Sequence, residues 1–100
     1  PLEELEFSSQ LTCFDAEFQG CWTVKGINVE NMESYRRGEG VMIVLGTTKG
    51  RVMALDGETG EIVLDLSHPS CANMVKFHEE EGLLVSCHDD GTIVARSLSP

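Results

Sequence analysis

The residue types best suited to chemistry in this chain are histidine and cysteine, which gather in its last third. The residues concerned are His68, Cys71, His78, Cys87 and His88, and these are the two side-chain types that most often bind zinc. Their spacing matches no compact structural zinc pattern, and adjacent strand residues point to opposite faces, which separates Cys87 from His88. We therefore expect no metal ligands here. We expect His68 to be a structural, hydrogen-bonding residue.

Acidic clusters and a cysteine nucleophile are the other candidates for reactivity. Asp89-Asp90-Gly91 is typical of a hairpin turn, and Glu79-Glu80-Glu81 is typical of a solvated loop between strands. Cys87 has no local signature of a catalytic Cys-His pair. The sequence also lacks a glycine-rich phosphate loop, a nucleophile elbow and a metalloprotease helix motif. We expect no catalytic residue and no cofactor in this stretch, and no enzyme activity.

An internal repeat indicates which elements position these residues. Three stretches, Leu11–Asp15, Val52–Asp56 and Ile93–Ser97, align at a constant offset of 41 residues, and Met42–Val44 aligns with Leu83–Val85 at the same offset. A period of about 40–45 residues built from short strands is typical of four-stranded propeller blades. Helical repeats of similar length are disfavoured, because the segments lack helical spacing and are rich in β-branched residues.

The turn signals divide the chain into short antiparallel strands. We expect strands over residues 11–16, 21–24, 27–35, 41–45, 52–55, 61–66, 72–77, 83–87 and 92–98. Residues 36–40 are predicted to form a polar loop. The continuous apolar run Val41–Leu45 predicts a strand that is covered on both faces. No connection has room for a crossover helix, which favours a meander of hairpins.

The predicted fold class is therefore all-β, with antiparallel four-stranded blades of a β-propeller. The boundaries we expect are the end of a blade over residues 1–26, a full blade over 27–66 and most of a further blade over 67–100. Closed propellers contain four to eight blades, whereas 100 residues supply about two and a half. We interpret the chain as an incomplete segment of a longer polypeptide.

Composition narrows the choice of partners and compartment. The net charge of −10 disfavours binding to nucleic acid and to anionic membranes, and the seven Lys and Arg residues are scattered. No apolar stretch is long enough to span a membrane. The four cysteines (Cys13, Cys21, Cys71 and Cys87) could form two disulfides in a secreted chain. We expect reduced thiols in a cytoplasmic or nuclear protein, because Cys13 lies in an apolar strand run.

Residues 67–98 resemble a WD40 repeat. Ser67-His68 stands at the family's Gly-His position, Ala72, Val75 and Phe77 follow at the family spacing, Asp90-Gly91-Thr92 forms the turn, and Arg96-Ser97 stands at the Trp-Asp position. The resemblance implies that His68 donates a hydrogen bond to Asp90 within the blade. It also implies that the usual hydrogen-bonded chain is incomplete, since His88 and Arg96 replace its Ser/Thr and Trp. Arg96 would be free to pair with Asp89 or Asp90.

A second stretch, Gly50–Glu61, looks like the repeats of quinoprotein-type propellers. The shared pattern is Ala-Leu-Asp-x-x-Thr-Gly-Glu, in which Asp56 and Thr59 can bond backbone amides and Gly60 can adopt positive φ. Repeats of that family usually end in a Trp that docks one blade onto the next. Ile62 and Leu64 occupy that region here, and Trp22, two residues after Gly20, stands where a docking Trp would.

The WD40 resemblance implies a scaffold whose rim loops bind other proteins. The candidate contact residues are Thr48, Lys49, His88 and Asp89 on one rim, beside the loop 68–70, and Arg36 and Arg37 on the opposite rim, beside the loop 79–81. The implied partners are other proteins and the remaining blades of the parent chain, not nucleic acid or membranes. Two alternatives stay open: a propeller enzyme, such as a quinoprotein-like oxidoreductase or a hydrolase, and a purely architectural segment.

Overall fold

The described part of the chain is built from antiparallel strands. A computed structural model describes residues 10–14 and 20–98, and no helix occurs among them. The strands are β1 Gln10–Phe14, β2 Gly20–Lys25, β3 Val29–Arg37, β4 Gly40–Thr47, β5 Val52–Asp56, β6 Ile62–Leu66, β7 Ala72–His78, β8 Leu83–His88 and β9 Ile93–Ser97. The same residues contain no long apolar helix of the kind that crosses a bilayer. The all-β prediction is confirmed.

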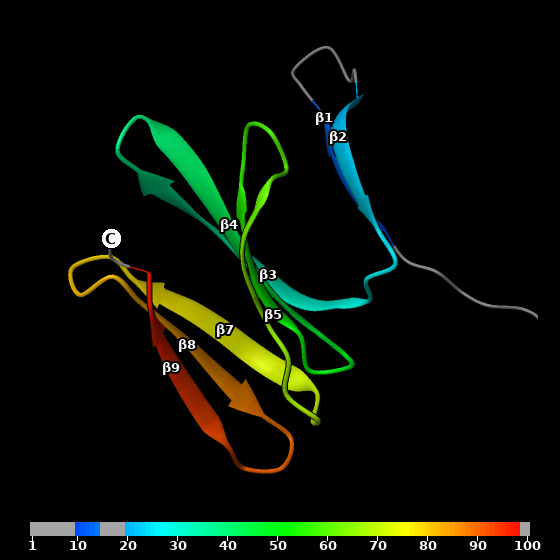
Figure 1. Cartoon of the computed structure of the whole chain (residues 1–100), viewed down its shortest axis with the longest axis vertical. Coiled ribbons are helices and arrows are strands. Elements are labelled where there is room, and N and C mark those ends of the chain that lie inside the picture. Colours follow the sequence, from blue (N-terminus) through cyan, green and yellow to red (C-terminus); the bar gives the residue numbers. More distant parts are fainter. Residues whose placement is uncertain (1–9, 15–19, 99–100) are drawn as a thin grey trace, which may run out of the picture.

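The strands form three separate sheets, each made of strands that are consecutive in the chain. The first sheet contains β1 and β2, the middle sheet β3 to β6, and the last sheet β7 to β9. Figure 1 shows the three sheets one after another across the molecule, from β1 and β2 at upper right to β9 at lower left. The first sheet spans residues 10–25, the middle sheet residues 29–66 and the last sheet residues 72–97. The arrangement is open, because the sheets do not close into a ring.

The middle sheet is covered on both faces, as the apolar run in β4 predicts. Met42 and Val44 pack into a cluster with Ala72, Val75, Phe77 and Leu84 of the last sheet. The intervening residues Ile43 and Leu45 point the other way, into a cluster with Leu11 and Val24 of the first sheet. Val41 is the exception: it is 41% exposed beside the β3–β4 turn, so the double coverage begins at Met42.

The 41-residue offset reappears in the strand register. Met42 pairs with Asp56 across β4 and β5, and Leu83 pairs with Ser97 across β8 and β9, so both members of the pair move by 41 positions. All five pairs of one hairpin correspond to those of the other. The register shift between Cys13 and Phe14 in β1 likewise recurs between Ala54 and Leu55 in β5. Asp56 and Ser97 therefore occupy equivalent places, whereas Asp15 lies outside the described residues.

The middle and last sheets meet along β3 and β4 on one side and β7 on the other. The rings of Tyr35 and Phe77 pack edge to face with centroids 5.6 Å apart, and the Phe77 N–H donates to the Tyr35 hydroxyl at 3.2 Å. Asn31 Nδ2 donates to the Ala72 carbonyl at 2.8 Å, across the same junction. The junction therefore combines apolar packing with directional hydrogen bonds, and together they fix the orientation of the last sheet relative to the middle sheet.

One predicted loop is wrong. Residues 36–40 were expected to form a polar loop, but Arg36 and Arg37 are the last residues of β3, and Arg37 pairs with Gly40. Only Gly38 and Glu39 form the turn, with Gly38 at φ +62°. A two-residue hairpin turn of this kind needs a residue that tolerates positive φ, and glycine supplies it at no steric cost. The strand therefore extends further than its polar sequence indicates.

Candidate functional site

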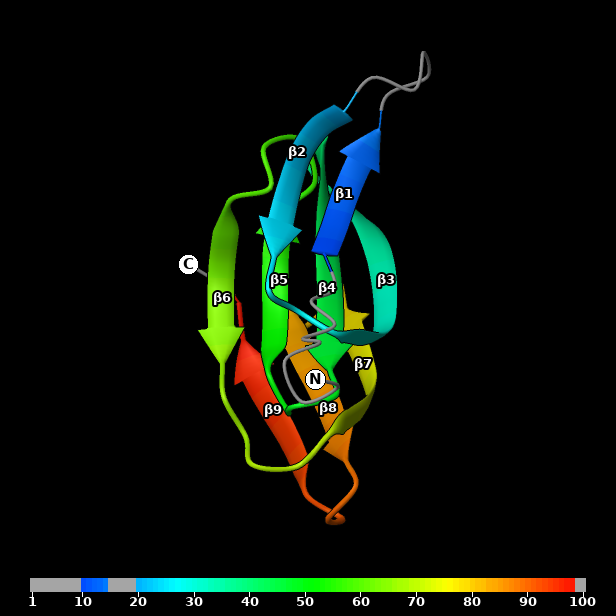
Figure 2. The ribbon, with the colours of Figure 1, turned by 90° about the vertical axis from the view of Figure 1, so that its right-hand side faces the viewer.

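The turns that join the strands gather at two opposite ends of the sheets. We call residues 48–51, 67–71 and 89–92 the histidine rim, because backbone hydrogen bonds tie them together at one end. Figure 2 shows the β6–β7 connection and the β8–β9 turn at this same end. The residues at the other end, 36–40 and 79–82, form the arginine rim. Thr48, Lys49 and Asp89 lie in the histidine rim, and Arg36 and Arg37 lie in the arginine rim.

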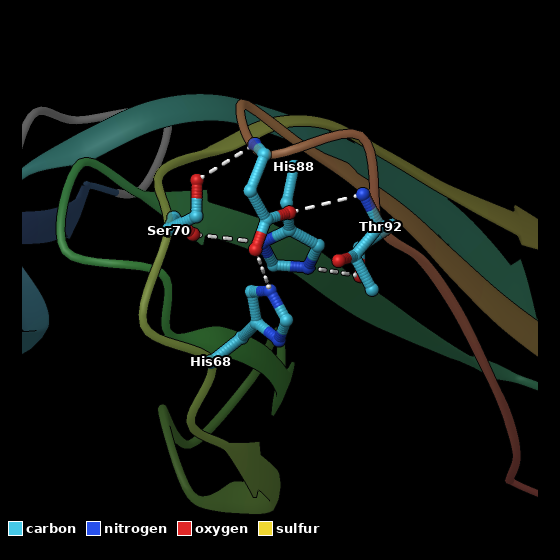
Figure 3. Close-up of polar contacts among 6 residues, drawn as sticks. His68, Ser70, His88 and Thr92 are labelled. Carbon is cyan, nitrogen blue, oxygen red and sulfur yellow. Dashed lines mark hydrogen bonds and ion pairs between the residues drawn. The ribbon is translucent and has the colours of Figure 1, made fainter.

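The histidine rim is organised by a hydrogen-bonded pair. His68, in the connection between β6 and β7, has its Nε2 3.0 Å from Oδ2 of Asp90 in the β8–β9 turn. The imidazole N–H donates to the carboxylate, and Asp90 in turn donates its backbone N–H to the Ser70 hydroxyl at 3.0 Å. These two bonds hold the connection against the turn (Figure 3). This is the contact that the WD40 resemblance implies for His68 and Asp90.

His88 differs from what the sequence predicted. It was expected to be a contact residue in a rim loop, but it ends β8 and is only 5% exposed. Its Nδ1 lies 2.8 Å from the Ser70 carbonyl, and its Nε2 lies 2.9 Å from the Ser86 hydroxyl. A carbonyl can only accept, so Nδ1 donates, and Nε2 of the neutral ring accepts from Ser86. Both ring nitrogens are used internally, so His88 is a structural residue.

Sequence reasoning placed Ser70 in a rim contact loop but did not find that it connects the two histidines. Its carbonyl accepts from His88 and its hydroxyl accepts from Asp90. The rings of His68 and His88 lie beside it with centroids 4.1 Å apart (Figure 3). The alternating burial of Leu84, Ser86 and His88 along β8 follows the period of a strand, and that period was the available signal that His88 points inward.

Asp90 is held as an anion although its side chain is 43% exposed. The Thr92 hydroxyl, the Thr92 backbone N–H at 2.9 Å and the His68 ring together lower the pKa of Asp90 from 3.8 to about 2. Hydrogen bonds to a carboxylate favour its charged form, and here they also close the turn. Asp90 therefore has a structural role in the turn.

This lowered pKa predicts an acid-sensitive contribution to stability. A carboxyl group with a folded pKa of about 2 and an ordinary value of 3.8 stabilises the fold fully above pH 5. That contribution is lost as the pH falls from about 4 to about 2. Denaturant midpoints measured between pH 5 and pH 2 should fall more steeply for the wild type than for Asp90→Asn.

The variant Thr92→Val supplies the control for this measurement, because it removes the hydroxyl and keeps the backbone N–H. Its pH dependence should lie between those of the wild type and Asp90→Asn. Parallel curves for all three proteins would show that Asp90 is not held as an anion by these bonds.

The other candidate residues of the histidine rim are exposed. Thr48 and Lys49 occupy the β4–β5 turn, and Asp89 follows β8. The Asp89 carboxylate accepts a short hydrogen bond from Asn73 Nδ2, and its backbone N–H donates to the Cys71 carbonyl at 3.0 Å. Thr48 and Lys49 thus present their side chains to solvent, whereas Asp89 also ties β8 to the start of β7.

The arginine rim carries a cleft with a volume of about 300 Å³. Its walls come from two neighbouring sheets, and its lining residues are Arg36, Arg37, Gly38, Phe77, Glu79, Glu80 and Gly82. The structure thus brings the predicted arginines and the predicted acidic loop together around one opening. The cleft has both charges at its mouth and an aromatic ring in its wall.

Arg37 has a further contact that sequence reasoning did not find. Its Nη2 donates to the Leu98 carbonyl of the last sheet at 3.1 Å. In the first sheet, Trp22 Nε1 donates to the Gly57 carbonyl of the middle sheet at 3.0 Å. Gly57 and Leu98 are 41 residues apart, so equivalent carbonyls accept from a donor on the preceding sheet at both junctions. Arg37 thus donates from the middle sheet to the last sheet, as Trp22 donates from the first sheet to the middle sheet.

Trp22 also packs directly on the β5–β6 turn. A Cβ added to Gly60, which has φ +76°, would lie 2.6 Å from the Trp22 ring. The turn is closed by Asp56, whose Oδ1 accepts from the backbone N–H groups of Glu58 and Thr59. Trp22 therefore has the position of a docking residue between neighbouring sheets.

We expect Trp22 to contribute measurably to stability. Trp22→Phe removes the bond to Gly57 and keeps a smaller aromatic ring, and it should lower the free energy of unfolding by about 1 kcal/mol. Trp22→Ala also removes the ring and should cost about 3 kcal/mol. Val63 is the equivalent residue 41 positions later and is 53% exposed, so Val63→Ala should change stability by less than about 0.5 kcal/mol. Equal urea midpoints for the Trp22 and Val63 variants would contradict the docking role.

The residues considered above as metal ligands or nucleophiles do not gather at one place in the described part of the chain. Within 10–14 and 20–98, no three His, Cys, Asp or Glu side chains are close enough to hold a metal ion. Cys71 and Cys87 are free thiols. Partial burial, and then the Asp89 and Glu30 carboxylates, raise the pKa of the Cys71 thiol, which disfavours the reactive thiolate.

The expected pairing of Arg96 with Asp89 or Asp90 is wrong. Arg96 pairs with Leu84 in the strand register, whereas the β8–β9 turn precedes the opposite end of β9. Four residues of extended strand separate Arg96 from Thr92, a distance of about 13 Å. Arg96 forms no ion pair with any described residue.

Comparison with protein-family models, with curated proteins and with solved structures finds no match for this chain. The likeness to WD40 repeats and to quinoprotein-type repeats therefore remains a hypothesis based on the residues quoted above.

Proposed function

We propose that this chain is a run of consecutive β-propeller blades from a larger protein, and that its rims bind partner proteins as WD40-like scaffolds do. The main support is the face-to-face stacking of sheets whose hairpins correspond at an offset of 41 residues. Propeller blades are such sheets, repeated radially around a channel. The middle and last sheets also make contact along β3 and β7, the first strands of their respective sheets.

Three features favour protein partners at the rims. Thr48 and Lys49 are exposed on a turn that is anchored by its backbone, since the Thr48 N–H donates to the Asn28 carbonyl. The arginine rim offers a cleft with both charges and an aromatic wall, and such mixed surfaces suit peptide segments. The net charge of −10 favours partners with basic or mixed surfaces. A cytoplasmic or nuclear location fits the free thiols of Cys71 and Cys87.

The proposal is tested by charge reversal at exposed rim positions. The immobilised chain would be used to capture proteins from a cytoplasmic extract, beside the variants Lys49→Glu and Arg36→Glu. We expect at least one captured protein to be lost with one rim variant. Lys25→Glu is the matched control, because Lys25 is exposed in β2 and belongs to neither rim. Identical captures by all four proteins would contradict the scaffold role and favour a purely architectural segment.

A quinoprotein-like oxidoreductase is the second candidate, and one observation favours it. Trp22 docks on the Asp56–Gly60 turn in the position that the quinoprotein-type resemblance assigns to a docking Trp. Titration with pyrroloquinoline quinone and calcium, followed by absorbance and thermal unfolding, separates the two candidates. Stoichiometric binding would favour the enzyme, whereas no change in either signal is the result expected for a scaffold.

A further inference from the structure

The β4–β5 turn, residues 47–51, shares its backbone hydrogen bonds with the β8–β9 turn, residues 88–92. In each turn the first residue donates its N–H to the carbonyl of the fifth, and the fourth donates its N–H to the carbonyl of the first. The second residue of each turn donates back to the connection before its sheet, to the Asn28 carbonyl in one case and to the Cys71 carbonyl in the other. The two places can therefore be compared position by position.

In the last sheet, side chains fill the space between this turn and the connection. The His88 ring donates to the Ser70 carbonyl, and the Asp90 carboxylate accepts from His68 and Thr92 (Figure 3). The Asp90 N–H donates to the Ser70 hydroxyl. The turn of the last sheet therefore contains its own carboxylate, which is hydrogen-bonded to both the turn and the connection.

In the middle sheet, the equivalent place is a pocket with a volume of about 40 Å³. Thr47, which is 2% exposed, stands where His88 stands in the last sheet, and its side chain is smaller than an imidazole. Lys49 stands where the last sheet has Asp90. The pocket is lined by Gly26, Ile27, Asn28, Thr47, Lys49 and Arg51. It has room for about three water-sized groups, and a carboxylate group has a similar size.

Several hydrogen-bond donors of the lining residues have no acceptor among the described residues. Two belong to Lys49, its ammonium group and its backbone N–H, and a third is the Asn28 side-chain amide. The Lys49 N–H lacks the hydroxyl that its counterpart in the last sheet has, because Ile27 replaces Ser70. A further donor is the hydroxyl proton of Thr47, whose oxygen accepts from a backbone N–H of the same turn. A carboxylate accepts several hydrogen bonds at once, so one such group can satisfy these donors together.

The charges around the pocket favour an anion. Arg51 is paired with Asp65 at 2.6 Å, whereas Lys49 forms no ion pair with any described residue. No Asp or Glu is among the lining residues of this pocket. The chain as a whole carries a net charge of −10 and repels free anions, so an acidic group is best delivered within a segment that is otherwise basic or neutral.

We propose that the pocket at Lys49 binds the side-chain carboxylate of an Asp or Glu residue of a partner protein, in a segment whose neighbouring residues are basic or neutral. The partner thereby supplies to the middle sheet the carboxylate that Asp90 supplies to the last sheet. Hydrogen bonds between charged groups are the stronger class, so Lys49 provides most of the affinity, and Asn28 and Thr47 fix the position of the carboxylate. This binding mode rests on the proposed function, since it is the chemistry by which the histidine rim recognises a partner.

The test titrates the intact chain with two peptides, acetyl-Lys-Ala-Asp-Ala-Lys-amide and its counterpart with Asn in place of Asp. The Asp peptide should bind about tenfold more tightly or better, because the Asn peptide cannot form a charge-assisted hydrogen bond with Lys49. Non-specific attraction to a chain of net charge −10 predicts the opposite order, since the Asn peptide is the more positive one. The NMR signals of the Lys49 backbone amide and of the Asn28 side-chain amide should shift with the Asp peptide.

Variants of the chain locate the binding. Lys49→Gln removes the ammonium group and should weaken the Asp peptide about tenfold while leaving the Asn peptide unchanged. Arg36→Gln is the matched control, because it removes the same charge at an exposed position of the opposite rim, and it should keep the preference for the Asp peptide. Asn28→Ala removes a donor on the connection side of the pocket and should also weaken the Asp peptide.

Several results would overturn the proposal. Binding of the Asp peptide would be absent at millimolar concentration, no tighter than that of the Asn peptide, or weakened equally by Lys49→Gln and Arg36→Gln. Tighter binding of the same peptide with phosphoserine in place of Asp, lost with Lys49→Gln, would also overturn it, because the pocket would then select phosphate.

These outcomes are distinguishable from those of the capture experiment. A captured protein that is lost with Lys49→Glu, while the two peptides bind alike, would contradict the carboxylate pocket and leave the rim function standing. A preference for the Asp peptide together with unchanged captures would support the pocket and contradict the scaffold role.

Discussion

Replacing Gly50 with alanine should lower the free energy of unfolding by about 4 kcal/mol or more, which is a large fraction of the stability of an ordinary domain. Gly50 has φ +88°, and an added Cβ would lie 1.9 Å from the His68 carbonyl oxygen and 2.5 Å from that of Ser70. Both atoms belong to the backbone, and the His68 N–H also donates to the Gly50 carbonyl at 3.1 Å. The β6–β7 connection would therefore have to move as a whole.

Gly91→Ala is the matched control for this effect. Gly91 lies 41 residues after Gly50 and has a similar φ of +85°, but a Cβ built there meets nothing within 4 Å. Only the conformational cost of positive φ remains, about 1–2 kcal/mol. Urea unfolding followed by the fluorescence of Trp22 measures both variants. Equal losses at the two positions would show that the connection does not approach Gly50 closely.

Replacing Gly46 with alanine should lower the free energy of unfolding by about 3 kcal/mol, because it separates the middle sheet from the last sheet. An added Cβ would lie 2.7 Å from the Ala72 Cβ, 2.8 Å from Val75 Cγ2 and 3.0 Å from the Ala72 carbonyl oxygen. Gly46 thus makes room for β7 against β4. Thermal or urea unfolding of the variant beside the wild type measures the loss.

Ala72→Gly tests whether the loss comes from this contact. Combined with Gly46→Ala, it removes the nearest clashing atom and should recover part of the stability, with a coupling energy of about 1 kcal/mol or more. Strictly additive losses would mean that Gly46 does not face Ala72 across the junction.

The repeat made most of the strands predictable. The 41-residue offset and the glycine turns indicated where β4, β5, β8 and β9 lie, because those hairpins have short turns and clear apolar runs. The coverage of β4 on both faces followed from its continuous apolar sequence. These properties are local, so a short stretch of the sequence is enough to predict them.

The remaining features depend on contacts between residues that are far apart in the sequence, and a short stretch of sequence does not contain those contacts. The length of β3 is stabilised by pairing with β4 out to Gly40, which overrides the polar character of Arg36 and Arg37. His88 was predicted to be a loop residue because Asp89 and Asp90 follow it. Its environment is instead set by Ser70, which lies in the connection between β6 and β7. The contact of Arg37 with Leu98 joins residues 61 positions apart and has no sequence signal.

The central claim is that equivalent sheets follow one another in the chain and pack face to face. Nuclear Overhauser spectra of the chain test it most directly at the junction of the middle and last sheets. We predict cross-peaks between the Gly46 α-protons and the Ala72 methyl group, and between the rings of Tyr35 and Phe77. Intact hairpin cross-peaks within each sheet, without either of these contacts between sheets, would contradict the account.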